Sequence, residues 1–123
     1  MILIDANAIL RYILCDNEDM ATQVEDLLEN EIVTARHEVL AEVVYVLDKI
    51  YKLPRTEIHL VIEQFLGLDN VYTDDYAVVH LALLTFGQTR LDFVDTLLYA
   101  HHAITGAKVF TFDRKLLAKM KRS

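Results

Sequence analysis

Apolar residues along the chain follow two spacings, which predict strands alternating with helices. Short apolar or β-branched runs predict strands over residues 1–5, 31–35, 70–73 and 108–112. Apolar residues elsewhere recur every three or four positions, which predicts seven helices. The predicted helices cover residues 6–14, 18–30, 37–51, 56–66, 76–86, 93–105 and 114–121.

Proline and glycine positions set several of these boundaries. Pro54 interrupts the helical pattern, and Thr56 is a candidate N-cap for the helix that follows. Gly87 separates two predicted helices, and Gly106 closes the second of them. Because strands alternate with helices, the chain is predicted to be an α/β protein with a parallel sheet covered by helices.

Composition agrees with one compact domain over residues 1–123. The chain has 54% apolar and 25% charged residues, with only three glycines and one proline, so long linkers are not expected. The single cysteine, Cys15, excludes an internal disulfide framework and suits a reducing compartment. No basic segment precedes the apolar start and no apolar run is long enough to span a membrane, so a cytoplasmic location is expected.

Acidic residues stand where parallel strands would end. Asp5 follows the first predicted strand and Asp113 follows the last, and right-handed crossovers place these ends at one edge of the sheet. Glu42 lies in a helical run with almost no other polar residue, which predicts that it is buried together with a partner. Asp95 lies three residues after Asp92. A structural role is open for each: Asp5, Asp92 and Asp113 can cap helices, and Glu42 can face solvent.

If these carboxylates converge, a cation is expected among them. Two unit charges about 4 Å apart repel by roughly 4 kcal/mol at an effective dielectric near 20. Carboxylates without cysteine or histidine favour Mg²⁺ or Mn²⁺ over Zn²⁺, and such ions activate water against phosphodiesters. The net charge of −7 argues against a general nucleic-acid binder, although five of the twelve lysines and arginines lie in the last ten residues.

Four motifs make the sequence resemble a PIN domain, specifically of the VapC-like toxin class. The motifs are the start through Asp5 and Asn7, Ala41-Glu42-Val43, the stretch from Asp92 through Asp95 to Ala100, and the segment that ends in Thr111-Phe112-Asp113. The resemblance implies a three-layer α/β/α fold with a central, mainly parallel sheet of four to five strands.

The resemblance also implies an activity. It implies a metal-dependent endoribonuclease of a toxin–antitoxin pair that cleaves RNA by metal-activated water, with Mg²⁺ or Mn²⁺ held by Asp5, Glu42, Asp95 and Asp113. Asp92, Asn7 and Thr111 are then accessory residues of the pocket. The resemblance further implies that the chain binds a small antitoxin and forms a homodimer.

Basic and apolar residues suggest further contacts. Arg11, Tyr12, Arg114 and Lys115 are candidate RNA contacts. The apolar stretches 45–51 and 77–86 favour a dimer or an antitoxin groove.

Two other readings compete with the ribonuclease. A PIN-like module that binds RNA or protein without cutting is the first, and the complete acidic set argues against it. A phosphate-accepting receiver domain is the second, and it fits poorly because Asp5 stands alone and Asp113 occupies the place expected for a lysine. Adjacent His101 and His102 make a poor metal chelate, because neighbouring helical residues point in different directions.

Overall fold

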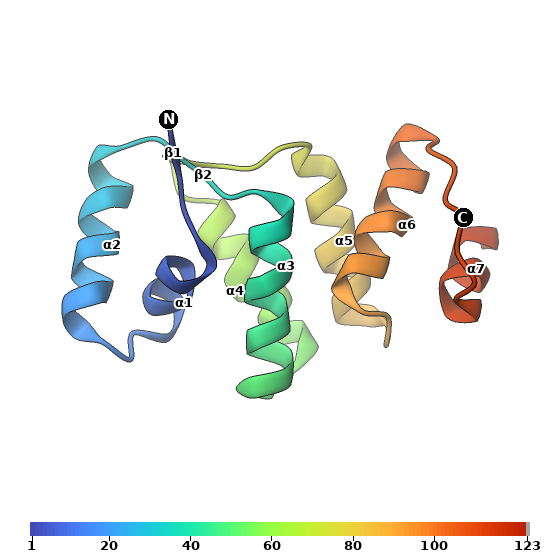
Figure 1. The fold of residues 1–123 in the computed structure, drawn as a ribbon, viewed down its shortest axis with the longest axis horizontal. Coiled ribbons are helices and arrows are strands. Elements are labelled where there is room, and N and C mark those ends of the chain that lie inside the picture. Colours follow the sequence, from blue (N-terminus) through green and yellow to red (C-terminus); the bar gives the residue numbers. More distant parts are fainter. Residues whose placement is uncertain (123) are drawn as a thin grey trace.

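The computed structural model describes residues 1–122 and consists of a small parallel sheet among helices (Figure 1). Ser123, the last residue of the predicted domain, lies outside the described residues. The sheet contains β1 (Ile2–Leu3), β2 (Val33–Thr34) and β3 (Val71–Tyr72), in the order β1-β2-β3 with parallel pairing throughout. The predicted α/β class is confirmed. The sheet of the described residues has three strands, however, where four to five were expected.

The helices account for most of the chain. They are α1 (Ala6–Leu14), α2 (Glu18–Asn30), α3 (His37–Tyr45), the π-helical turn η1 (Val46–Ile50), α4 (Arg55–Leu66), α5 (Tyr76–Gln88), α6 (Phe93–Thr105) and α7 (Arg114–Lys121). Four of them, α1, α2, α6 and α7, have the bounds that the apolar spacing predicts. Asp5, Asn17 and Asp113 cap three of these four with side-chain hydrogen bonds to the first turn.

Three predicted boundaries are wrong in ways that local chemistry explains. The helix predicted over residues 37–51 changes to a π-helical turn, in which the amide of Tyr51 donates to the carbonyl of Val46, five residues back. Pro54, not Thr56, is the N-cap residue of α4, with φ −57° and ψ 143°, the non-helical backbone of a residue just before a helix. Gly87 lies inside α5, whereas Gly106 ends α6 with a positive φ of 75°, as expected.

The predicted strand over residues 108–112 does not form. These residues have no strand partner among the described residues, and they lead directly from α6 into α7. Figure 1 shows α7 at one end of the molecule and β1 near the other, with α3, α4, α5 and α6 between them. The expectation that Asp5 and Asp113 stand at the ends of two strands of one sheet is therefore wrong, because only Asp5 follows a strand.

The core lies between the sheet and the central helices. Val33 and Val71 are buried on one face of the sheet, and they share a cluster with fully buried Leu40, Ile62 and Phe65 from α3 and α4. A smaller cluster joins Leu91, Tyr99 and Leu116, and it holds α7 against α6. Among the described helices, none has the length and apolar character needed to cross a membrane.

Candidate functional site

The first turn of α6 carries Asp95, an acid whose surroundings shift its pKa. Asp95 is half-buried, and its pKa is raised above the ordinary value, first by burial and then by the charges of Asp113 and Asp92. Asp92 is the N-cap residue of α6, and its side chain makes no capping hydrogen bond. Its carboxylate is therefore left without a first-turn amide to bind.

Asp113, at the start of α7, lies close enough to Asp95 for its charge to act on that residue. It caps α7, and its Oδ1 accepts a hydrogen bond of 2.8 Å from the amide of Leu116. Leu116 is fully buried against Leu91 and Tyr99, so the start of α7 is held near the start of α6. Thr111 Oγ1 accepts a hydrogen bond of 3.0 Å from the Asp113 amide, which makes Thr111 a support for this turn.

The other two predicted acids lie elsewhere. Asp5 caps α1 with a hydrogen bond of 2.8 Å from the amide of Ala8, and its side chain is exposed, as is that of Asn7. Glu42 lies on α3 and is exposed, so the expectation that an apolar helix buries it with a partner is wrong. Within residues 1–122, no group of three or more His, Cys, Asp or Glu side chains is arranged to hold a metal ion.

A cavity of about 290 Å³ opens beside Asp92 and Asp95. It lies between α3 and η1 on one side and the start of α6 on the other. Its walls combine apolar and charged side chains, and they are Ala41, Val44, Tyr45, Asp48, Lys49, Phe86, Asp92, Phe93, Val94 and Asp95. Exposed Tyr45 and Lys49 therefore share a cavity with two of the acids, and π-helical turns such as η1 often occur at functional sites.

Arg55 fixes the loop that leads into this cavity, and the sequence analysis missed it. Its Nη1 donates hydrogen bonds to three carbonyls: Phe86 at 3.3 Å, Thr89 at 3.1 Å and Leu91 at 2.6 Å. Its guanidinium also stacks 4.1 Å from the ring centroid of Phe86 and lies 3.8 Å from Asp48 Oδ2. The signal in the sequence was Asp48, an acid in a mainly apolar helical stretch.

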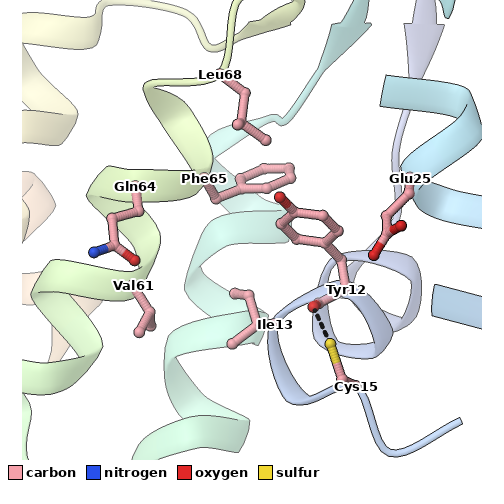
Figure 2. A pocket seen from close by; sticks show the side chains of 8 residues that line it. All are labelled: Tyr12, Ile13, Cys15, Glu25, Val61, Gln64, Phe65 and Leu68. Carbon is pink, nitrogen blue, oxygen red and sulfur yellow. Dashed lines mark hydrogen bonds between the residues drawn. The ribbon is translucent and has the colours of Figure 1, made fainter. Parts of the chain in front are cut away.

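The predicted RNA contacts divide into two places. Arg114 and Lys115 are exposed in the first turn of α7, directly after Asp113. Arg11 instead forms an ion pair of 2.7 Å with Asp16, and the ring of Tyr12 packs 5.9 Å from that of Phe65. Tyr12 lines a separate cavity of about 320 Å³ between α1 and α4 (Figure 2), none of whose lining residues belongs to the acidic set.

The two apolar stretches also behave differently. Tyr45, Ile50 and Tyr51 are exposed, so this part of the surface stays available to a partner. Most apolar residues of the stretch 77–86 are buried, because α5 lies between α4 and α6. The second stretch therefore belongs to the core.

The carboxylates around Asp95 present only oxygen ligands, and burial followed by repulsion from Asp113 and Asp92 raises the pKa of Asp95. This chemistry suits a hard divalent cation. No curated protein and no solved structure matches the chain. Residues 2–122 match the family model of the PIN domain, whose members are generally nucleases. The chain belongs to the PIN domain family.

Proposed function

We propose that this PIN domain is a Mg²⁺- or Mn²⁺-dependent endoribonuclease and that it acts as the toxin of a toxin–antitoxin pair in the cytoplasm. The observation that carries the proposal is the cavity lined by Asp92 and half-buried Asp95, whose pKa is raised by burial and then by the charges of Asp113 and Asp92. Negative charge is concentrated where two helices begin, and groups with perturbed pKa values cluster at functional sites. The arrangement costs stability in the absence of a cation, which supports a role beyond capping.

The residues that would hold the ion are Asp95 and Asp113, which lie within electrostatic reach of each other, with Asp92 as an accessory acid. A divalent cation bound there would supply a water of lowered pKa and neutralise charge on the scissile phosphate. Asp5 and Glu42 join the set through the family resemblance, and Asn7 and Thr111 are its accessory polar residues. Thr111 already holds the turn that presents Asp113.

Basic residues near the acids would orient the RNA backbone. Lys49 lines the cavity that contains Asp92 and Asp95, and Arg114 and Lys115 follow Asp113. Lysine and arginine side chains bind phosphates through charge without reading the sequence of bases. Contacts of Arg11 and Tyr12 with RNA stay a prediction, since these residues lie by another cavity.

The toxin role rests on the resemblance to VapC-like PIN domains and includes two partners, a small antitoxin and a second copy of the chain. Exposed Tyr45, Ile50 and Tyr51 support an apolar contact surface beside the cavity. An antitoxin bound over these residues would cover the cavity entrance, because Tyr45 belongs to its wall.

A PIN-like module that binds RNA or protein without cutting is the second candidate. The observation that favours it is the lack of a metal-binding group of three or more side chains within residues 1–122. Incubation of purified protein with total cellular RNA, with Mg²⁺ or Mn²⁺ and with chelator, separates the two. Discrete fragments that need the metal support the ribonuclease, whereas RNA binding without fragments at any metal concentration supports the module.

A further inference from the structure

Positively charged side chains gather around two adjoining hollows of the surface. The first, of about 600 Å³, lies between η1, the start of α4 and the end of α5, and the second, of about 240 Å³, lies between the loop after α5 and α7. Thr89 and Arg90 line both hollows, which makes the surface continuous. The cations that line it form what we term the basic strip, and they are Lys49, Arg55, Arg90, Lys115, Lys119 and Arg122.

The basic strip concentrates positive charge in a chain that is acidic overall. It contains six of the twelve lysines and arginines, and the lining residues of the two hollows include one of the nineteen acids, Asp48. The smaller hollow is lined by four cations and, within residues 1–122, by no acid. A cleft lined by one sign of charge focuses the electrostatic field and concentrates ligands of the opposite sign. The strip is therefore suited to an anionic ligand.

Three members of the strip have no structural role that explains their charge. Arg90, Lys115 and Arg122 are exposed, and within residues 1–122 none of them forms an ion pair. The dipole of α7 favours a cation at Arg122 but disfavours one at Lys115, which lies in the first turn. Like charges around one small hollow also repel one another, so the arrangement costs stability until an anion neutralises them.

The other members are held in place by contacts. Nη2 of Arg55 and Nζ of Lys49 lie 3.8 Å and 3.6 Å from Asp48 Oδ2. Lys119 Nζ lies 5.2 Å from the ring centroid of Tyr99. These contacts fix both ends of the strip before a ligand binds, which reduces the entropy lost on binding.

α7 presents its cations in a row. Lys115, Lys119 and Arg122 are four and three residues apart, which places them on one face of the helix. At 1.5 Å per residue the row extends over about 10 Å. Phosphates of one strand in a nucleic-acid duplex recur about every 3.4 Å along the axis, so the row is long enough for more than one phosphate.

The lining residues favour a phosphate backbone over other anionic partners. Within residues 1–122, no aromatic side chain lines either hollow, and the one large aliphatic residue there, Leu91, is buried. Stacking on bases needs exposed aromatic rings, and membranes and protein partners are held largely by exposed apolar or aromatic anchors. Phosphates need only the cations. The strip is therefore expected to bind RNA without regard to base sequence.

The basic strip begins at the cavity that contains the acids. Asp48 and Lys49 line both the 600 Å³ hollow and the 290 Å³ cavity of Asp92 and Asp95. In Figure 1 the loop between α5 and α6 lies at the lower edge of the molecule, between the lower end of α3 and α7. The surface thus changes from acidic to basic along one direction, from the cavity towards α7.

We propose that the basic strip is a phosphate-binding track for RNA that lies to one side of the cleavage site. The inference rests on the proposed function and adds a substrate requirement to it. With the scissile phosphate at the acids, the strand continues over Lys49 and Arg90 to the row of cations on α7. The substrate is then an RNA that extends several nucleotides beyond the cut on that side, and a shorter RNA loses affinity.

Binding without metal tests the track separately from catalysis. Fluorescence anisotropy of a labelled single-stranded oligouridylate is measured with chelator, so that no cleavage occurs. Arg90→Gln/Lys115→Gln/Arg122→Gln should bind roughly tenfold more weakly than the wild type, as expected for the loss of three exposed charge contacts. Its slope of log affinity against log salt should be smaller in magnitude by about 2, since each phosphate contact with a single strand contributes about 0.7.

A matched variant controls for net charge. Lys52→Gln/Lys108→Gln/Lys121→Gln removes the same charge from exposed residues outside the two hollows and should bind like the wild type. Both variants should give wild-type circular dichroism spectra. Equal weakening by the two variants, or none by either, overturns the track.

Competition decides whether the strip serves another anionic partner. Unlabelled oligoribonucleotides of different sequence should displace the probe equally well, because phosphate contacts do not read bases. Polyglutamate and phosphatidylserine vesicles, at the same concentration of negative charge, should displace it poorly. Displacement by either as efficient as by RNA overturns the proposal in favour of an acidic protein segment or a membrane surface.

Truncated substrates place the strip relative to the cut. For the wild type, removal of one flank of a cleaved RNA should raise KM by roughly tenfold and removal of the other should have little effect. The triple variant Arg90→Gln/Lys115→Gln/Arg122→Gln should lose this difference. Equal effects of the two truncations on the wild type overturn the one-sided track. If the wild type cuts no RNA, the proposed function fails, while binding in chelator still decides whether the strip holds phosphates.

Discussion

Arg55 Nη1 donates a hydrogen bond of 2.6 Å to the carbonyl of Leu91, the residue that precedes the N-cap Asp92 of α6. The contact joins the first residue of α4 to the loop that positions the acidic turn of α6. Hydrogen bonds from the same nitrogen to Phe86 and Thr89 hold the end of α5 in place. The Arg55 guanidinium thus holds the backbone that leads into Asp92 and Asp95.

Replacement of Arg55 should therefore loosen the site as well as the fold. Arg55→Ala leaves several carbonyls without their donor and is expected to lower the free energy of unfolding by about 1.5–3 kcal/mol, the range for hydrogen bonds to charged groups. Urea unfolding followed by circular dichroism measures it. Arg90→Ala, at an exposed residue of the same loop, is the control and should change stability by less than about 0.5 kcal/mol. Equal effects of the two variants would contradict the role of Arg55.

Leu116 provides a second test of how the acids are brought together. Leu116→Ala empties a fully buried position between α7 and α6 and is expected to cost about 2–5 kcal/mol. Leu117→Ala, one residue further along the same helix, changes a side chain that is exposed and should cost much less. Thermal unfolding of both variants gives the comparison. Similar melting temperatures would show that α7 does not depend on this contact.

The raised pKa of Asp95 predicts how stability changes with pH. Because the folded state holds the proton more tightly than the unfolded state, ionisation of Asp95 destabilises the fold as the pH rises through its pKa. Asp95→Asn should therefore be more stable than the wild type at pH 7. The difference should shrink as the pH falls towards 3.8, the ordinary value for aspartate.

Urea unfolding at several pH values tests this dependence. Asp26→Asn, at an exposed acid on α2, should show no such stabilisation. A less stable Asp95→Asn at neutral pH, with Asp26→Asn unchanged, would mean that Asp95 supports the fold through a contact that asparagine cannot replace.

Divalent cations should reverse this electrostatic cost. Mn²⁺ at about one hundred times its Kd is expected to stabilise the wild type by about 2.7 kcal/mol, because only the folded state binds it. The increase in melting temperature should be lost with chelator and should be much smaller in Asp95→Asn. An equal increase in both proteins would place the ion elsewhere.

Local spacing predicts the helices well, because each helix depends mainly on residues close in sequence. The bounds of α1 and α6 follow from apolar periodicity and from the caps at Asp5 and Gly106. The residue pattern over 108–112 is as clear as that of the helices, but a strand also needs the edge of another strand with which to pair. No local pattern specifies whether that edge lies in the same chain.

In the candidate site, too, the sequence predicts what depends on neighbouring residues and misses what depends on distant ones. Asp92 and Asp95 could be placed together because they lie on one helical turn, and Asp113 was correctly placed at the start of the next helix. Burial of Glu42 was wrong, because an apolar run on α3 leaves one side open to solvent and the sequence does not say which. Arg55 was missed, because its partners are backbone carbonyls more than thirty residues away.

The most direct test of the central claim is the rate at which Asp95→Asn cleaves RNA in saturating Mn²⁺. We expect a fall of about a hundredfold or more relative to the wild type, as for the loss of a positioned catalytic carboxylate. Asp26→Asn should cleave at the wild-type rate, and both variants should give wild-type circular dichroism spectra. An Asp95→Asn protein that is folded and fully active would contradict the assignment of the acidic group as the active site.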